Sequence, residues 1–279
     1  RRAFVNPIVF DPLISRYMSK ILDLKKASRF SIHALLNYRA DKRALAHADS
    51  ILADTVQHRD YFARTFHCDP ASIHVLPVGY HTDDFYPTTA KQRKKSAGKT
   101  VIGFYGSFFP MHGIDVIADA AASFSTDRDV TFECVGSGPT MQSIQDIIRK
   151  RRLSNIALLG KKPYSELNGY INSWDLCLGI FGSTLKARMV IPNKVYHYAA
   201  CRKPIITLDT PAIRELFTDN RDIFLVPDRP GALAERIRAV RDNPRQAEDV
   251  ARKGHDLVSN QYTHEHIGKR IADIIRYLK

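Results

Sequence analysis

From Thr100 onward, short apolar segments alternate with segments in which apolar residues recur every three or four positions. The first kind predicts buried strands and the second predicts helices that bury one face. Short connections join them, and a chain of this kind forms a parallel sheet covered by helices on both faces. We therefore predict one α/β domain over residues 100–262. Its strands are expected at 100–105, 130–135, 155–159, 176–181, 204–208 and 223–226. Its helices are expected at 114–124, 141–151, 165–173, from 193, 231–241 and 246–259, and a further helix at 265–278.

The residues before this domain predict a smaller α/β unit over residues 1–87. Strands are expected at 4–10, 50–53 and 73–76, and helices at 32–48 and from 54 or 55 to 66. Because the chain lacks an initial Met and opens on a strand, we expect this unit to be a partial N-terminal domain. Residues 88–99 are polar, basic and free of apolar periodicity, which is typical of a linker. The C-terminal helix, over 263–279, could pack back on the N-terminal domain.

The chain is strongly basic. It has 42 Lys and Arg against 29 Asp and Glu, a formal net charge of +13. Such an excess suits a solvated surface, an anionic substrate, an anionic membrane or a nucleic acid. The basic residues are dispersed and no nucleic-acid motif is present, so we do not expect a nucleic-acid partner. Peripheral contact with an anionic membrane stays open.

The number and spacing of the cysteines indicate the redox environment of the protein. The four cysteines are scattered and form no C-x-x-C pair, and Cys134 and Cys177 lie in apolar strand-like runs. This pattern is typical of a reducing cytoplasm and predicts neither disulfides nor a zinc site. There is no run of eighteen apolar residues and no visible secretory signal. We expect a cytoplasmic protein, with membrane association as an open alternative.

The segment from Leu178 to Leu216 carries the strongest functional signal. An apolar strand ends at Phe181, and a Gly/Ser/Thr turn leads to three cations, which are Lys186, Arg188 and Lys194. We expect Asn193 to be the N-cap of the next helix, whose first backbone N–H groups have no partner within the helix. Those donors, the helix dipole and Lys194 predict an anion site. The dipole contributes only about 0.3–1 kcal/mol, so the cations are needed to hold a diphosphate.

Three glycines are expected at the same edge of the sheet as the predicted anion site. Gly106, Gly136 and Gly182 each follow a predicted strand. The carboxyl ends of parallel strands share one edge of the sheet, and ligands of such sheets bind there. Glycine lets backbone N–H groups approach a ligand closely.

The order of these elements carries a family resemblance. The residues concerned are Pro192-Asn193-Lys194, Lys203-Pro204-Ile205-Ile206 and Glu215, with Ala48-Asp49 before the strand at 50–53 and the Pro77-Val78-Gly79 turn. In these features the chain resembles glycosyltransferases of family four, which have the GT-B fold. The resemblance implies two Rossmann-like domains with parallel sheets, of which the N-terminal one is incomplete here. It also implies retaining transfer of a sugar from a nucleotide-diphospho-sugar to an acceptor hydroxyl, in polysaccharide or glycolipid synthesis.

The resemblance also implies site residues. Catalytic positions would be Lys186, Arg188 and Glu215. Donor-binding positions would be Gly106, Ser107, His112, Gly113, Gly136, Gly160, Lys161, Asn193, Lys194 and His197. The implied partners are a UDP- or GDP-linked sugar and a glycan or lipid-linked acceptor. The family generally works without a metal, and the sequence has no Asp-x-Asp motif, so we expect no metal and no cofactor beyond the sugar nucleotide.

Four positions depart from the family pattern. Ser107 and His112 stand where an Arg and a Lys usually contact the diphosphate, and Met189 and His197 replace two glutamates. His112 could supply a charge when protonated, or be an ordinary residue at a helix start. His197 could bind a ribose hydroxyl or pack within the helix. Glu215 could meet the sugar, orient its turn, or be a first-turn Glu favoured by the helix dipole.

Two other functions remain as alternatives. A nucleotide-sugar epimerase could share the fold, with acidic and His residues facing the sugar. A non-catalytic partner related to glycosyltransferases would explain why fixed charges are missing from the predicted donor loop. Product analysis separates the first alternative from sugar transfer, and donor binding without turnover supports the second.

Overall fold

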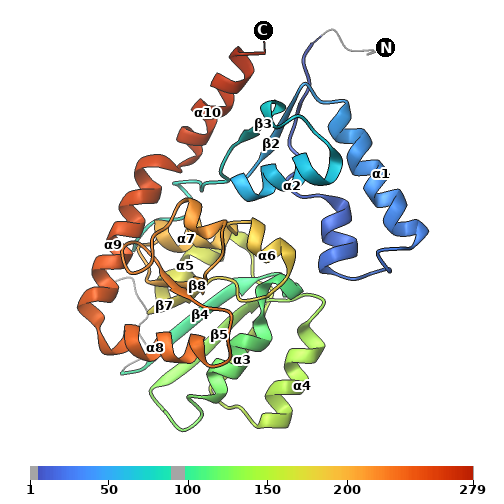
Figure 1. The fold of residues 1–279 in the computed structure, drawn as a ribbon. Coiled ribbons are helices and arrows are strands. Elements are labelled where there is room, and N and C mark those ends of the chain that lie inside the picture. The colour runs from blue at the N-terminus through green and yellow to red at the C-terminus, as the bar shows by residue number, and fades with distance from the viewer. Residues whose placement is uncertain (1–5, 89–97, 279) are drawn as a thin grey trace.

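The computed structural model describes residues 6–88 and 98–278, which form two α/β parts with separate parallel sheets (Figure 1). The N-terminal sheet has the strand order β1-β2-β3. Its strands are β1 (Val9–Phe10), β2 (Ser50–Ala53) and β3 (Ile73–Val75). Its helices are the π-helix η1 (Met18–Asp23), α1 (Ile32–Ala46), α2 (Val56–Phe66) and the 3-10 turn η2 (Pro70–Ser72).

The C-terminal sheet has six parallel strands in the order β6-β5-β4-β7-β8-β9. They are β4 (Thr100–Gly106), β5 (Val130–Gly136), β6 (Ile156–Gly160), β7 (Leu176–Leu178), β8 (Ile205–Leu208) and β9 (Phe224–Val226). The α-helices are α3 (Ile114–Ala122), α4 (Met141–Arg151), α5 (Leu167–Ser173), α6 (Leu185–Met189), α7 (Asn193–Ala200), α8 (Ala232–Asp242), α9 (Pro244–Gln261) and α10 (His264–Arg276). The 3-10 turns are η3 (Pro110–His112), η4 (Tyr164–Glu166) and η5 (Ile213–Glu215).

Apolar side chains fill both faces of the larger sheet. Phe104 and Phe132 belong to the cluster that includes residues of α3 and α8, while Val101 and Cys177 belong to the cluster that includes residues of α5 and α7. A sheet covered on both faces explains why its strands read as continuous apolar runs. The strand order reverses between β4 and β7, so this is the switch point where a crevice opens at the carboxyl ends.

The predicted strands are confirmed as elements, with differences at their ends. β7 ends at Leu178 and not at Phe181, and beyond its end the N–H of Ile180 donates to the side chain of Thr207. The predicted strand over 4–10 is observed only as β1, and its residues 4 and 5 lie outside the described residues. The turn expected after β7 contains the unpredicted helix α6. Thr184 begins this helix by accepting a hydrogen bond from the N–H of Ala187, 3.3 Å away.

The connection between the two parts lies beside the start of α10. Tyr80 and Thr263 form an isolated parallel bridge, and the ring of His81 stacks on that of His264 at 4.0 Å between centroids. From there α10 runs away from the larger sheet, on the side of the N-terminal part (Figure 1). Most of the predicted linker, residues 89–97, lies outside the described residues.

Candidate functional site

Two loops meet at the switch point of the larger sheet. The N–H of Phe181 donates to the carbonyl of His112 at 3.1 Å, and that of Gly182 donates to Met111 at 3.1 Å. Gly113 lies between them with φ +61°, and a Cβ there would come within 2.5 Å of the backbone of Phe181. The loops after β4 and β7 therefore form one fixed wall, and Gly113 lies in it.

Lys194 lies beneath this wall, in the first turn of α7. Its side chain is 4% exposed, and its Nζ has no hydrogen-bond partner. The Nζ lies 4.0 Å from the centroid of the Phe104 ring. Burial holds the pKa of Lys194 well below its ordinary value. A buried ammonium without a partner is costly, so this position suits a lysine that pairs with an anionic ligand.

Gly106 leaves the space above Lys194 open. A Cβ at Gly106 would lie 2.8 Å from the Nζ of Lys194 and 3.1 Å from Cε1 of His112. Gly136 makes a second close approach, since its Cβ would come within 1.8 Å of the carbonyl oxygen of Gly106. Both predicted donor-binding glycines thus shape the same turn after β4.

His112 is buried beside Lys194, and its Nδ1 has no hydrogen-bond partner. Burial, together with the nearby charges of Lys194 and Lys186, lowers the pKa of His112 to about 2. The imidazole is therefore neutral in the free protein, and a protonated His112 next to a bound phosphate stays a prediction. A neutral imidazole can still donate one N–H to a ligand.

Asn193 does not have the predicted capping role. Pro192 is the N-cap of α7 and Asn193 is already its first helical residue, with no side-chain cap bond at this end. Proline supplies the fixed φ that starts a helix but no capping oxygen. The first-turn N–H groups at this end thus have no side-chain acceptor, as the anion-site hypothesis requires. The side chain of Asn193 itself is exposed.

The predicted cations of α6 diverge. Arg188 is exposed, whereas Lys186 is partly buried, with its Nζ 5.8 Å from the centroid of the Phe109 ring. Burial lowers the pKa of Lys186, and the charge of Asp23 opposes this shift. Lys186 therefore faces the N-terminal part of the molecule.

Asp23 is a buried acidic residue at the contact between η1 and α6 that was not predicted from the sequence. It ends η1, is 3% exposed, and neither of its carboxylate oxygens has a hydrogen-bond partner. The sequence offers one indication of Asp23, because it is the sole acidic residue between Asp11 and Asp41. Asp23 and Lys186 lie on opposite sides of the junction between η1 and α6.

His197 packs within the protein. Its Nδ1 is hydrogen-bonded to the Tyr105 hydroxyl, and its ring stacks on Phe85 with 3.7 Å between centroids and 13° between planes. Burial lowers the pKa of His197 to about 3. These contacts are those of the helix-packing alternative, and a ribose contact stays a prediction.

Glu215 joins the two parts of the molecule. Its carboxylate accepts hydrogen bonds from the N–H of Val56 at 2.7 Å and of Gln57 at 2.9 Å, at the start of α2. Beside it, the Thr55 hydroxyl donates to the carbonyl of Met189. Burial raises the pKa of Glu215, while the two backbone N–H groups lower it. Both carboxylate oxygens of Glu215 are thus hydrogen-bonded to the backbone of α2. A catalytic role for Glu215 remains a prediction.

The remaining predicted positions lie at the periphery. Ser107 is exposed directly after β4. Gly160 ends β6 and Lys161 follows it, and β6 is the edge strand, separated from β4 by β5. The structure thus gathers Gly106, His112, Gly113 and Lys194 into one site, with Lys186 at its border.

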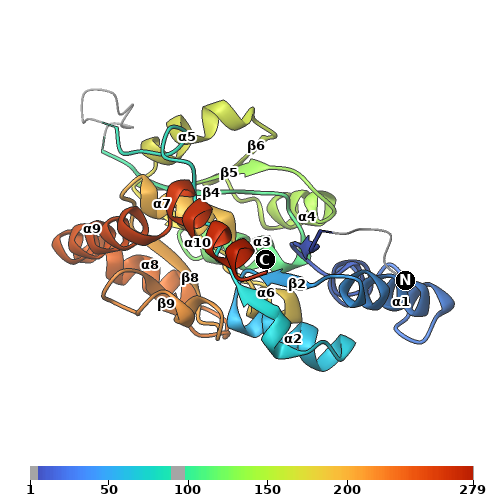
Figure 2. The same cartoon turned by 90° about the horizontal axis from the view of Figure 1, so that it is seen from above.

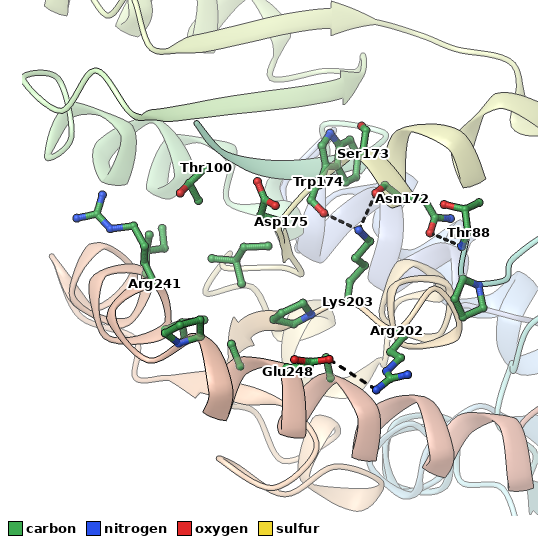
Figure 3. A pocket seen from close by; sticks show the side chains of 18 residues that line it. Thr88, Thr100, Asn172, Ser173, Trp174, Asp175, Arg202, Lys203, Arg241 and Glu248 are labelled. Atoms are coloured by element: carbon green, nitrogen blue, oxygen red, sulfur yellow. Dashed lines mark hydrogen bonds and ion pairs between the residues drawn. The ribbon is translucent and has the colours of Figure 1, made fainter. Parts of the chain in front are cut away.

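A pocket of about 570 Å³ lies at the opposite edge of the same sheet, near the amino ends of β4, β7 and β8 (Figure 3). Its buried lysine, Lys203, points at backbone oxygens and donates to the carbonyls of Asn172 at 2.7 Å and Trp174 at 2.6 Å. At its rim, Arg202 and Glu248 form a 3.9 Å ion pair. Because protein groups already satisfy Lys203, this pocket does not show the unpaired charge found at Lys194.

Three further properties concern the described residues. Residues 6–88 and 98–278 contain no group of three or more His, Cys, Asp or Glu side chains that could hold a metal ion. Within the same ranges, every helix is too short or too polar to cross a membrane. All four cysteines are free thiols.

Comparisons with known proteins agree on the family. Residues 99–243 match the family model described as "Glycosyl transferases group 1". Among curated relatives, the "Phosphatidylinositol N-acetylglucosaminyltransferase GPI3 subunit" of Saccharomyces cerevisiae is 27% identical over 214 residues, covering 74% of this chain and 45% of the relative. "Uncharacterized glycosyltransferase MJ1178" of Methanocaldococcus jannaschii is 24% identical over 162 residues, 55% of this chain and 42% of the relative. The chain thus spans less than half the length of these relatives.

Solved structures show the fold. Anabaena Alr3699/HepE in complex with UDP and glucose superposes with a TM-score of 0.80 at 18% identity, covering 97% of this chain and 71% of that one. Sucrose-phosphate synthase from Thermosynechococcus elongatus gives a TM-score of 0.76 at 20% identity, covering 92% and 66%. The predicted fold class, α/β of GT-B type with parallel sheets, is confirmed.

Proposed function

Because this chain belongs to the glycosyl transferases of group 1, we propose that it transfers a sugar from a nucleotide-diphospho-sugar to an acceptor hydroxyl with retention. The observation that carries the proposal is the buried, unpartnered Nζ of Lys194 under the Gly106 turn. In the narrower classification we assign the chain to family four, on the Pro192-Asn193-Lys194 helix start.

The proposed donor site uses Lys194 for the diphosphate. As the bond from the sugar to the phosphate oxygen breaks, negative charge grows on that oxygen. An ammonium held in a dry site stabilises this charge more strongly than one in water, because the local dielectric is low. His112 donates a neutral N–H to the same group, and Lys186 contributes positive charge from the border of the site. A catalytic contact of the exposed Arg188 stays a prediction.

The chemical step balances without a protein base. The sugar leaves its phosphate oxygen, that oxygen takes the proton of the acceptor hydroxyl, and the acceptor oxygen bonds to the same face of the sugar. The products are a nucleoside diphosphate and a glycoside. We propose that no metal and no cofactor take part, since Lys194 and Lys186 offer the required positive charge.

The similar proteins support a more specific donor and acceptor. The Anabaena structures contain UDP, UDP with glucose, or UDP-glucose, so we propose a UDP-linked hexose as donor. The name of the yeast relative specifies N-acetylglucosaminyl transfer to phosphatidylinositol, which supports a lipid-linked acceptor. We therefore place the protein in glycolipid synthesis, with polysaccharide synthesis as the broader class.

The test is product analysis with the full-length protein. Radiolabelled UDP-hexoses are incubated with and without a lipid extract, in the presence of EDTA. We expect release of UDP and a labelled glycolipid whose anomeric configuration, determined by NMR, matches that of the donor. A donor sugar that changes configuration without any acceptor would show an epimerase instead. Donor binding without any turnover would show a non-catalytic partner.

A further inference from the structure

A buried carboxylate of the N-terminal part is left unpaired by the fold. Within residues 6–88 and 98–278, three Asp side chains are buried, namely Asp23, Asp41 and Asp222, at 3%, 9% and 4% exposure. Asp41 and Asp222 each accept two hydrogen bonds, at 2.7 and 2.8 Å. Neither oxygen of Asp23 has a partner. Because burying an unpaired carboxylate is costly, Asp23 resembles Lys194 in having hydrogen-bonding capacity that the folded chain does not use.

The segment that holds Asp23 has an unusual and well-anchored backbone. Asp23 is the last residue of η1, and π-helical turns are rare and are found frequently at functional sites. Two residues later, Lys25 has φ +48°, a left-handed conformation that is unfavourable for a bulky residue. At the other end of η1, the N–H of Tyr17 donates to Asp41 at 2.8 Å. The fold thus fixes Asp23 in position in spite of local strain, as is common for residues that bind ligands.

Asp23 lies across the junction from the border of the donor site. η1 contacts α6, and α6 lies next to α2 of the N-terminal part in both views (Figures 1 and 2). The charge of Asp23 opposes the burial that lowers the pKa of Lys186, so the two side chains are close in space. In the described part of the chain, no hydrogen bond joins them. Lys186 also lies near His112 of the donor wall.

Other contacts across the junction are direct. Glu215 accepts hydrogen bonds from the N–H of Val56 at 2.7 Å and of Gln57 at 2.9 Å, and the Thr55 hydroxyl donates to the carbonyl of Met189. These groups hold the two parts together without a ligand.

Asp23 and Lys186 lie on the two sides of the same junction without bonding. Two carboxylate oxygens and an ammonium are therefore left for a molecule that binds between the two parts.

We propose that Asp23 and Lys186 bind neighbouring hydroxyl groups of a sugar ring at this junction. An ionised carboxylate only accepts hydrogen bonds, so its two oxygens match two O–H donors, and the ammonium of Lys186 matches the lone pairs of the same hydroxyls. A phosphate has no donor for Asp23 and is repelled by it. The diphosphate therefore belongs at Lys194, with the ring towards Asp23. A ring that lacks one of the hydroxyls leaves the buried carboxylate unpaired, so Asp23 selects the sugar.

This inference rests on the proposed function, in which two substrates carry such a ring. One is the hexose of the donor, and the other is the acceptor. Their hydroxyl chemistry is the same, and the experiment has an arm for each. It uses the full-length protein and compares the wild type with Asp23→Asn, which keeps the shape of the side chain. The matched control is Asp222→Asn, a buried carboxylate in the larger domain whose hydrogen bonds are complete.

Calorimetric titration in EDTA with UDP, and with the UDP-hexose that the wild type uses, is the donor arm. If the hexose binds Asp23, Asp23→Asn should weaken binding of the UDP-hexose at least tenfold and that of UDP less than twofold. Deoxy analogues of the UDP-hexose then link the effect to a hydroxyl. The wild type should bind at least one of them tenfold more weakly, and Asp23→Asn should not discriminate against it.

Initial rates with increasing amounts of lipid extract are the acceptor arm. If the acceptor binds Asp23, the half-saturating amount of extract should rise at least tenfold in Asp23→Asn, while its affinity for the UDP-hexose stays within twofold. The Asp222 control should behave as the wild type in both arms.

Urea denaturation separates ligand binding from a structural role. Asp23→Asn should leave the free energy of unfolding unchanged or raise it, because a buried unpaired charge becomes a neutral amide. Asp222→Asn should lower it, because a charged acceptor of two hydrogen bonds is lost. An equal loss in both variants would make Asp23 a structural residue and overturn the inference.

Unchanged behaviour of the folded Asp23 variant in both arms would also overturn the inference. Failure of the proposed function has a different signature, because the wild type would then bind no UDP or form no glycoside.

Discussion

Lys194, in the first turn of helix α7, and Lys203, just after its end, are equally buried, at 4% exposure each, but their surroundings differ. Lys203 donates to two backbone carbonyls at the amino edge of the sheet. Lys194 has no hydrogen-bond partner at the carboxyl edge, and burial holds its pKa well below the ordinary value. The hydrogen bonds of Lys203 stabilise the fold. Lys194 lowers the stability of the fold unless a ligand supplies negative charge.

This difference separates a structural pocket from a candidate site more clearly than cavity size does. The pocket around Lys203 is large, yet its buried cation is already satisfied. At the carboxyl edge, Lys194 and His112 are both buried with an unpartnered nitrogen. Buried polar atoms that have no hydrogen-bond partner and lie in a rigid wall are typical of a site that binds a ligand.

The largest expected effect is on stability. Lys203→Met should lower the free energy of unfolding by about 1–3 kcal/mol, because the carbonyls of Asn172 and Trp174 lose their donor. Lys194→Met should leave it unchanged or raise it, because a desolvated ammonium is removed. Urea denaturation measures the free energy of unfolding of both variants. A greater loss in the Lys194 variant would mean that Lys194 is a structural residue.

The next effect concerns the space above Lys194. Gly106→Ala should weaken UDP binding about tenfold, or about 1.4 kcal/mol, because the added Cβ would lie 2.8 Å from the Nζ. The control is Gly169→Ala, where a Cβ would have nothing within 4 Å. Calorimetric titration compares the UDP affinity of the two variants. Unchanged affinity in the Gly106 variant would show that the diphosphate does not bind at this turn.

Binding should also depend on pH. Burial lowers the pKa of Lys194 in the free protein, and a bound diphosphate should raise it again. Between those two pKa values binding takes up a proton, so affinity falls as pH rises through this window. Titrations in buffers of different ionisation enthalpy measure the uptake. Lys194→Met should abolish it, and persistent uptake in that variant would assign the proton to another group.

The smallest expected effect concerns the junction of the two parts. Glu215→Gln should destabilise the contact with α2 by about 0.5–1 kcal/mol, because a charged group near the helix N-terminus is lost. UDP affinity should stay within twofold. The control, Glu265→Gln, removes an exposed first-turn carboxylate of α10. A large loss of UDP affinity in the Glu215 variant would show that this carboxylate serves the donor site.

The sequence was sufficient for the strand and helix pattern of the larger domain, because its buried strands read as apolar runs between helical periods. It also indicated Gly106 and Lys194 through their places in that pattern. It could not reveal that α6 is a helix, since five residues carry too little periodicity. Asp23 and the role of Glu215 also escaped prediction, because both depend on contacts between distant segments.

The charge state of His112 could not be predicted for a related reason. The position of the residue in the loop left a protonated imidazole and an ordinary helix-start residue as alternatives, whereas its pKa depends on burial next to Lys194 and Lys186. Tertiary burial outweighs the ordinary pKa of a histidine here. The same holds for His197, whose hydrogen bond with Tyr105 and stacking on Phe85 join three elements of the chain.

The most direct test is calorimetric titration of UDP and GDP in the presence of EDTA, on the wild type, Lys194→Met and Lys203→Met. The account predicts micromolar binding of one nucleotide by the wild type and by the Lys203 variant, weakened at least tenfold, about 1.4 kcal/mol, in the Lys194 variant. Equal affinity in all three folded proteins, or no binding of either nucleotide by the wild type, would contradict the assignment of Lys194 to a diphosphate site.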